Sequence, residues 1–299
     1  MTVTAPRVLV SGNCQTAGLA AALLRTGAAR ETHALPLTGD TPEALRTKLD
    51  ALAPTTDLWL LSPNNKVARA AAEAHGKRVQ LLPLVQFGAF QPDICYAWHR
   101  GTRTLTSPHY NSAIVVWGWR NGLDVADTAA LFRADTFAAL GYFDAWAQGV
   151  KDLQRVFADA GLGHRLADWF LAVKRGGCFM HSMNHPHVDA VVRLARVLAD
   201  EAGLSVVRDI APGEIHDGLN GTMWPVYPEI AARLGIGGGS YCWKYLTQNR
   251  FVDGVEAFVA QAFAGYERQG IGRADLEITY QDAAPVDRAL RRITGRPAA

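Results

Sequence analysis

Apolar and polar positions alternate along the first 85 residues in a way that separates short strands from helices. Short apolar runs predict strands over residues 7–10, 33–37, 57–62 and 79–84. The stretches between these runs predict helices over residues 16–25, 42–52 and 66–75. Because strands that alternate with helices are typical of a parallel sheet with crossover connections, this part of the chain predicts a three-layer α/β core.

The middle and the end of the chain follow other patterns. Residues 86–120 are rich in aromatic side chains without a regular period, which predicts a hydrophobic wall. Residues 127–174 carry apolar side chains at helical spacing, and the last thirty residues are polar, which predicts a loosely held tail. The same reasoning predicts a returning strand over 178–182 and helices over 188–202, 228–234 and 251–266.

We therefore expect an α/β protein with a parallel sheet and a large helical insertion, folded as a single domain over residues 1–299. A chain of this length buries roughly three quarters of its unfolded surface and needs no metal or disulfide to fold. The expected parts are an α/β core over about 6–85 and 176–202, a helical insertion over about 110–175 and a helical C-terminal part over about 203–299.

Charge and cysteine content narrow the function. The 30 Lys and Arg against 28 Asp and Glu give a formal charge of +2, which creates no field for nucleic acid. The four cysteines form neither a CxxC pair nor a zinc pattern, so we expect free thiols in a reducing compartment and no metal site. No apolar run is long enough to cross a membrane. We expect a cytoplasmic protein, and the sequence leaves a homo-oligomer open.

Three turns follow predicted strands of the sheet and carry chemically useful side chains. They contain Asn13-Cys14-Gln15, then Asn64, then Asn184-His185. Cys14 lies at a helix start, where unpaired N–H groups and the helix dipole favour a thiolate; the alternative is a small buried residue of a tight turn. Because a nucleophile, amide donors and an imidazole base are the minimum set for acyl transfer, we expect Cys14, Asn64 and His185 to be catalytic.

The Gly12-Asn13-Cys14-Gln15 turn, the Pro-His-Tyr-Asn-Ser run at 108–112 and the Phe-Met-His-Ser-Met-Asn-His-Pro segment at 179–186 resemble the WcbI family of capsular polysaccharide biosynthesis enzymes. The resemblance runs from about residue 6 to about residue 266. It implies a coenzyme A-binding acetyltransferase with a fold related to the SGNH/GDSL hydrolases. Residues expected to bind coenzyme A, acetyl-CoA or the saccharide are Gly12, Asn13, Gln15, His109, Tyr110, Asn111, His181 and Asn184.

The hydrolase comparison implies roles and one departure. Gly12-Asn13-Cys14 matches the GDS block with cysteine in place of serine, and Asn64 matches the asparagine of the GxND block. The late DxxH block keeps His185 but has Ser182 where its aspartate stands. His185 must therefore be oriented by Ser182, by a backbone carbonyl or by a distant acid such as Glu214.

The sequence thus predicts a CoA-dependent O-acetyltransferase that acts on a sugar of a bacterial capsular or surface polysaccharide or its precursor. Transfer through an acetylated Cys14 and direct transfer from acetyl-CoA both stay open. Two other functions also stay open, an SGNH-type esterase or thioesterase and a non-catalytic protein that binds coenzyme A or glycan.

Overall fold

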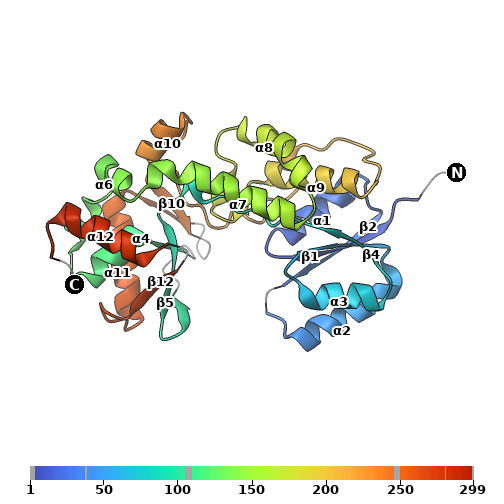
Figure 1. Ribbon diagram of the computed structural model, residues 1–299, viewed down its shortest axis with the longest axis horizontal. Helices are drawn as coiled ribbons and strands as arrows, with labels where there is room; N and C mark the ends of the chain where they lie inside the picture. Colours follow the sequence, from blue (N-terminus) through green and yellow to red (C-terminus); the bar gives the residue numbers. More distant parts are fainter. Residues whose placement is uncertain (1–3, 38, 105–109, 246–249, 280, 298–299) are drawn as a thin grey trace. The chain divides into compact units, whose positions relative to one another are not determined.

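The computed structural model describes residues 4–37, 39–104, 110–245, 250–279 and 281–297 (Figure 1). The chain divides into two compact units. The first unit contains Met1–Gln86, Val150–Met180 and Asn184–Asn220, and the second contains Phe87–Gly149, His181–Met183 and Gly221–Ala299. The single domain expected from the sequence stays a prediction.

The first unit contains a four-stranded parallel sheet with the strand order β2-β1-β3-β4. Its strands are β1 (Arg7–Gly12), β2 (Glu31–Pro36), β3 (Leu58–Leu61) and β4 (Arg78–Leu81). The parallel sheet predicted from the first 85 residues is confirmed. The strand predicted over 178–182 forms as β8 (Met180–Ser182) but does not join this sheet, which corrects its assignment to the parallel core.

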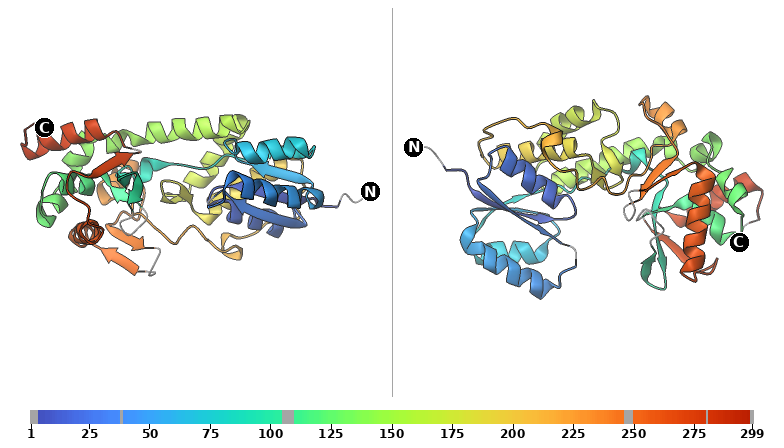
Figure 2. Two further views of the ribbon diagram at one scale, coloured as in Figure 1. Left: turned by 90° about the horizontal axis from the view of Figure 1, so that it is seen from below. Right: turned by 180° about the vertical axis from the view of Figure 1, so that it is seen from behind.

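Helices cover both faces of the parallel sheet (Figures 1 and 2). One face carries α2 (Pro42–Leu52) and α3 (Lys66–Ala74), and the other carries α1 (Thr16–Arg25) and α9 (Val188–Glu201). The relation to SGNH hydrolases stays a prediction. The unit also contains α8 (Leu166–Lys174), β9 (His185–Pro186) and the 3-10 helices Ala53–Thr55, Gly163–Arg165 and Pro212–Glu214.

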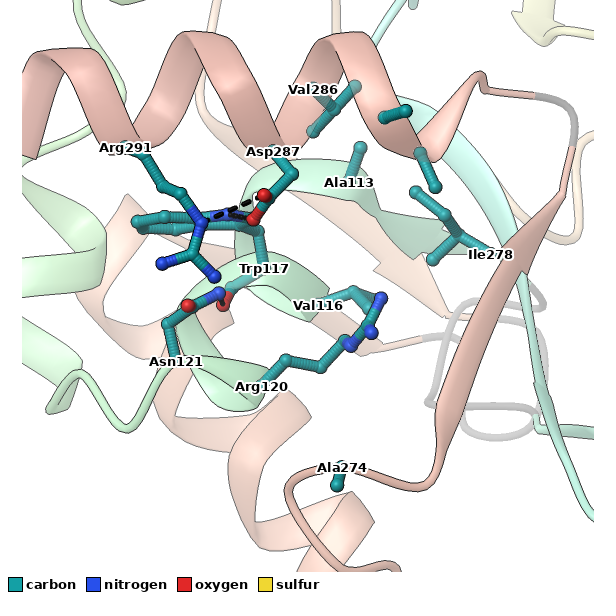
Figure 3. Close-up of a pocket in the computed structure, with 12 residues that line it drawn as sticks. Ala113, Val116, Trp117, Arg120, Asn121, Ala274, Ile278, Val286, Asp287 and Arg291 are labelled. Atoms are coloured by element: carbon teal, nitrogen blue, oxygen red, sulfur yellow. Dashed lines mark hydrogen bonds and ion pairs between the residues drawn. The ribbon is translucent and has the colours of Figure 1, made fainter. Parts of the chain in front are cut away.

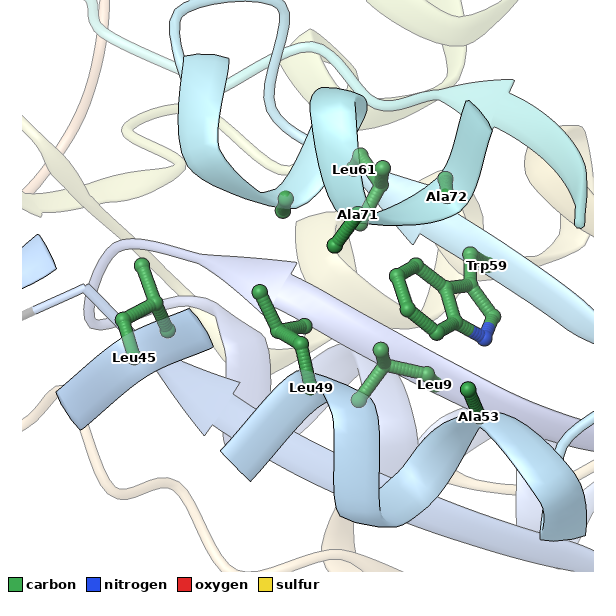
Figure 4. Close-up of a cluster of buried hydrophobic side chains, with 9 residues drawn as sticks. Leu9, Leu45, Leu49, Ala53, Trp59, Leu61, Ala71 and Ala72 are labelled. Atoms are coloured by element: carbon green, nitrogen blue, oxygen red, sulfur yellow. The ribbon is translucent and has the colours of Figure 1, made fainter. Parts of the chain in front are cut away.

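The core below the sheet shows why these elements form where they do. Leu9, Leu49 and Trp59 lie fully buried between the sheet and helices α2 and α3 (Figure 4). Each such side chain stabilises the fold by about 1.5–3 kcal/mol relative to exposure. The Trp59 indole N–H donates to Thr56 Oγ1 at 2.7 Å, so its polar atom is satisfied inside the core.

The second unit is built around an antiparallel sheet with the strand order β12-β5-β6, in which β7 also pairs with β5. Its strands are β5 (Ile94–His99), β6 (Thr102–Thr104), β7 (Asn111–Ser112) and β12 (Leu276–Thr279), and β10 (Cys242–Tyr245) pairs with β11 (Arg250–Asp253). Its helices are α4 (Ala113–Arg120), α5 (Val125–Ala129), α6 (Ala134–Ala139), α10 (Pro228–Leu234), α11 (Val255–Arg268), α12 (Ala283–Thr294) and the 3-10 helices Gly88–Phe90 and Tyr142–Asp144. Helix α7 (Ala145–Asp159) begins in the second unit and ends in the first.

The C-terminal part differs from its prediction in two ways. It contains the strands β10, β11 and β12 besides its helices. Among the described residues of the last thirty, the predicted loose tail is replaced by a strand and a helix, because β12 pairs with β5 and α12 buries Val286, Ala289 and Leu290. The spacing of these three apolar residues is the helical signal that the polar composition concealed.

A buried carboxylate organises the centre of the second unit. Asp93 is fully buried and accepts hydrogen bonds from Tyr227 Oη at 2.7 Å, Tyr142 Oη at 3.0 Å and the Ile114 N–H at 3.2 Å. The ring of Phe137 stacks on both tyrosines, with centroid distances of 5.9 Å to Tyr142 and 5.5 Å to Tyr227. Asp93 and Ile114 lie in the segment that was predicted as a hydrophobic wall. That segment therefore contributes to a core whose central carboxylate is hydrogen-bonded on both oxygens.

Candidate functional site

The carboxyl edge of the parallel sheet gathers the turns that the sequence singled out. Strand β1 lies beside β3, and β3 lies beside β4, so the segments that follow these strands emerge side by side. Gly12 ends β1, residues 62–64 follow β3 and residues 82–86 follow β4. Cys14 and Asn64 are thus brought to one edge, as predicted.

Hydrogen bonds within the turn fix the position of Cys14. Asn13 Oδ1 accepts from the Gln15 N–H at 3.0 Å, and the Asn13 carbonyl accepts from Thr16 Oγ1 at 2.6 Å. Such an Asx turn directs the intervening side chain outward. The Cys14 thiol is exposed, which argues against the alternative of a small buried residue.

The protonation state of Cys14 differs from the expectation for a helix start. Desolvation raises the pKa of the Cys14 thiol above its ordinary value, and the backbone N–H groups of Cys14 and Gln15 oppose this effect only in part. Desolvation is the larger of these effects. Helix α1 begins at Thr16, and Gln15 is its N-cap. Cys14 precedes the helix and keeps its proton at neutral pH, so nucleophilic attack needs a base.

The Gln15 side chain joins three segments and is itself buried. Its Nε2 donates to the Val85 carbonyl at 2.8 Å and to the Asn184 carbonyl at 3.2 Å, and its Oε1 accepts from the Val85 N–H at 3.2 Å. Both amide hydrogens are therefore used by the protein. These contacts hold the turn of Asn184 against the turn of Cys14, and the expected role of Gln15 toward a ligand stays a prediction.

Helix packing supports the same arrangement. A Cβ at Gly18 of α1 would lie 3.1 Å from Val191 Cγ1 of α9, so the two helices approach more closely than a larger residue at Gly18 would allow. His185 lies just before α9 and is half-buried. The Gln15 hydrogen bond and this helix packing therefore hold the segment that carries Cys14 against the segment that carries His185.

The two side chains proposed to orient His185 have other partners. Ser182 Oγ donates to Tyr110 Oη at 3.0 Å. The Glu214 carboxylate accepts from Arg208 at 2.8 Å and from the Ala211 N–H at 2.9 Å, and these bonds hold its pKa below the ordinary value.

Asn64 and Asn65 are neighbours with opposite environments. Asn65 is buried, caps α3 through Oδ1 to the Ala68 N–H at 3.0 Å, and donates from Nδ2 to Ser11 Oγ at 3.2 Å. Asn64 is exposed, and within the described part of the chain its side chain has no hydrogen-bond partner. Asn65 is therefore structural, whereas Asn64 is open to a ligand.

Of the other expected binding residues, Gly12, Asn13 and Asn184 belong to the first unit. The second unit contains His109, Tyr110, Asn111 and His181. Asn111 is buried, donates from Nδ2 to the Thr104 carbonyl at 3.1 Å and accepts from Tyr266 Oη at 2.9 Å, so its amide is occupied. Tyr110 and His181 are also buried, and their roles toward a ligand stay predictions. His109 lies outside the described residues.

Two cavities differ in what lines them. The second unit has a cavity of about 400 Å³ between α4 and α12 (Figure 3). There Asp287 accepts from Trp117 Nε1 and from Arg291 Nε, each at 2.8 Å, so its polar groups bind one another. The first unit has a cavity of about 240 Å³ that includes Asn64 and was not anticipated from the sequence. The sequence signal for it was the pair of polar residues Ser62 and Asn64, which follow β3.

Neither metal binding nor membrane insertion finds support among the described residues. Within those ranges, no three His, Cys, Asp or Glu side chains gather as a metal site would require. The helices that the structure describes include none with the length and hydropathy to span a bilayer.

Comparisons with known proteins agree with the fold. A family model described as polysaccharide biosynthesis enzyme WcbI matches residues 7–206. One solved structure has 16% sequence identity and a TM-score of 0.67 over 97% of this chain and 95% of its own. It is described as WcbI, a novel polysaccharide biosynthesis enzyme, in the native form without a disulfide bond between coenzyme A and its Cys14. A search of curated protein sequences finds no match.

Proposed function

This chain belongs to the WcbI family of polysaccharide biosynthesis enzymes, and we propose that it transfers an acetyl group from acetyl-CoA to a sugar hydroxyl. The acceptor would be a unit of a bacterial capsular or surface polysaccharide or its precursor. The observation that carries the proposal is the exposed Cys14 thiol at the carboxyl edge of the parallel sheet. The description of the related structure, which places coenzyme A in relation to a cysteine, supports the choice of acyl donor.

In the first step Cys14 Sγ attacks the thioester carbonyl of acetyl-CoA. A bond forms between Sγ and the acetyl carbon, the bond to the CoA sulfur breaks, and coenzyme A leaves as a thiol. One thioester replaces another, so the step is close to thermoneutral. Because the Cys14 pKa is raised, its proton must be taken up as the bond forms. His185 is the base assigned to this transfer, and it then gives the proton to the departing sulfur of coenzyme A, which leaves His185 neutral for the second step.

In the second step the sugar hydroxyl attacks the acetyl group on Cys14. His185 takes the hydroxyl proton, the ester forms, and Cys14 leaves and recovers a proton. The N–H groups at the start of α1, with Asn13 and Asn64, stabilise the oxyanion of each tetrahedral intermediate. Direct transfer from acetyl-CoA to the sugar uses the same base and donors, with Cys14 only shaping the site.

The test is rapid quenching of the protein with acetyl-CoA, followed by intact-protein mass spectrometry. We expect an acetyl adduct on the wild type that is absent in Cys14→Ala and retained in Cys242→Ser, a control on a half-buried cysteine in the second unit. The Cys14→Ala variant should lose at least about a hundredfold in turnover. Full turnover in Cys14→Ala with no adduct on the wild type would exclude the covalent route.

A second measurement tests the acyl acceptor. Turnover of acetyl-CoA should depend on added saccharide, and the acetylated saccharide should accumulate in step with free coenzyme A. Turnover that ignores saccharide would show a hydrolase instead. Binding of coenzyme A without any turnover would show a binding protein, and either result would overturn the proposed transferase.

A further inference from the structure

The cavity beside Asn64 in the first unit lies at the same carboxyl edge of the parallel sheet as the turn that carries Cys14. It has a volume of about 240 Å³ and lies between the ends of β3 and β4 and the last turns of α7. Its lining residues are Ser62, Pro63, Asn64, Leu84, Gln86, Arg155, Val156 and Asp159.

Of the polar side chains that line this cavity, Arg155 pairs with Asp152 at 3.1 Å, whereas four others have no partner among the described residues. Ser62 is 1% exposed, and its buried Oγ has no hydrogen-bond partner among the described residues. Asn64, Gln86 and Asp159 likewise make no side-chain hydrogen bond or ion pair within the described ranges. Exposed side chains are often unpaired, but a buried hydroxyl is usually satisfied. Ser62 differs from the other unpartnered buried hydroxyls, those of Thr136 and Thr222, in that it lines this cavity.

The mixture of groups favours a neutral polyhydroxyl compound. Two carboxamides both donate and accept, a carboxylate accepts and a hydroxyl does either, while Leu84 and Val156 provide apolar surface. Arg155 brings one positive charge, but Asp159 lies one helical turn away on the same face of α7 and opposes it. A phosphate would meet that carboxylate, whereas a sugar hydroxyl would donate to it.

Size and position agree with this chemistry. Pockets for drug-sized ligands run from roughly 300 to 1,000 Å³, so this smaller cavity suits one sugar ring. A Cβ at Gly12 would lie 3.2 Å from Leu84 Cδ2, so one wall of the cavity touches the end of β1, two residues before Cys14.

We propose that this cavity holds the ring of the saccharide that accepts the acyl group, with Ser62, Gln86 and Asp159 binding its hydroxyls. The assignment rests on the proposed acetyl transfer for its role but not for the binding itself. Gln86 and Ser62 then determine affinity for the acceptor and leave the affinity for acetyl-CoA unchanged.

The test combines ligand-detected NMR with kinetics. Saturation-transfer NMR is run on the wild type with glucose, galactose, mannose and N-acetylglucosamine. At least one sugar should bind, and Gln86→Ala and Ser62→Ala should each weaken it by about fivefold or more, the worth of one neutral hydrogen bond. Gln154→Ala, an exposed glutamine of α7 outside the cavity, is the matched control and should bind normally.

Two results separate this inference from the proposed function. If acetyl transfer fails but sugar binding is lost in Gln86→Ala and Ser62→Ala, the cavity assignment stands alone. If transfer occurs and these variants raise the KM for acetyl-CoA instead of the acceptor, the cavity holds the donor and the assignment is wrong. Absence of binding for all four sugars to the wild type would also overturn it.

Thermal unfolding adds a readout that a structural role would not produce. Because the Ser62 hydroxyl has no partner, Ser62→Ala should keep or raise the melting temperature while it weakens sugar binding. A melting temperature that falls by several degrees would show that the hydroxyl supports the fold, and would contradict the ligand role.

Discussion

Two buried polar oxygens, one in each unit, differ in their hydrogen bonds. In the second unit, Asp93 is enclosed and accepts from two tyrosine hydroxyls and a backbone N–H. In the first unit, Ser62 Oγ is equally enclosed but has no hydrogen-bond partner among the described residues. Satisfying a buried polar group stabilises the fold, and leaving one open costs about 1–3 kcal/mol that a ligand can recover. Asp93 is therefore a structural group, whereas Ser62, which also lines a cavity, is the group that we assign to a ligand.

Removal of the Asp93 carboxylate should have the largest effect on the stability of the protein. Asp93→Ala leaves the hydroxyls of Tyr227 and Tyr142 and the Ile114 N–H without this acceptor inside the core, so we expect the free energy of unfolding to fall by about 4 kcal/mol. Urea unfolding followed by tryptophan fluorescence measures it. Glu267→Ala, an exposed carboxylate of α11, is the control and should change stability by less than about 0.5 kcal/mol. Equal effects of the two variants would show that Asp93 does not organise this core.

The pH dependence of the same residue gives the next largest effect. Burial raises the pKa of Asp93 to about 6, against the opposing hydrogen bonds from Ser112, Tyr227, Ile114 and Tyr142. Between about pH 4 and pH 6 the folded protein keeps a proton that the unfolded chain has lost, so this contribution to stability falls as the pH rises. We expect the free energy of unfolding of the wild type, relative to Asp93→Asn, to drop by up to about 3 kcal/mol from pH 4 to pH 7.

The subtraction is what makes this pH measurement specific. Hydrogen bonds hold the pKa of Asp50 and of Glu214 below the ordinary value, so their contribution to stability runs in the opposite direction and is lost toward acid pH. Asp50 and Glu214 are present in both the wild type and Asp93→Asn. Their contributions therefore cancel when the two free energies of unfolding are subtracted. A difference that stays constant from pH 4 to pH 7 would contradict the raised pKa of Asp93.

In the first unit, we expect a smaller change in stability when Asn65 is replaced and none when its neighbour Asn64 is replaced. Asn65→Ala removes a helix cap and a bond to Ser11, so the free energy of unfolding should fall by about 1 kcal/mol. Asn64→Ala removes no hydrogen bond between described residues; its stability should be unchanged, while acetyl transfer falls by about tenfold or more. Calorimetry and turnover measured on both variants check the pair. The reverse assignment of stability and activity would place the functional asparagine at position 65.

The local pattern of the first 85 residues was sufficient to predict most elements there. Helix α2 begins and ends where predicted, because Pro42 suits the first turn and Thr41 caps it. Helix α1 also matches its predicted bounds. The strand over 178–182 was placed in the wrong sheet, and the strand β12 and helix α12 were predicted as a loose tail. Both errors concern pairing between distant segments, since β12 is ordered through β5 and not through its own composition.

The local sequence is sufficient to place the Cys14 thiol directly after strand β1. A strand, an Asx turn and a helix are local features, so Cys14 at the end of β1 follows from residues within a few positions of it. Only the tertiary structure decided which polar groups are occupied. The Gln15 side chain donates to carbonyls 70 and 169 residues away in the sequence. The side chains of Asn64 and Ser62 have no hydrogen-bond partner among the described residues and line a cavity. A hydrogen-bond partner brought by folding leaves no mark on the neighbouring sequence, because the contact depends on how distant elements pack.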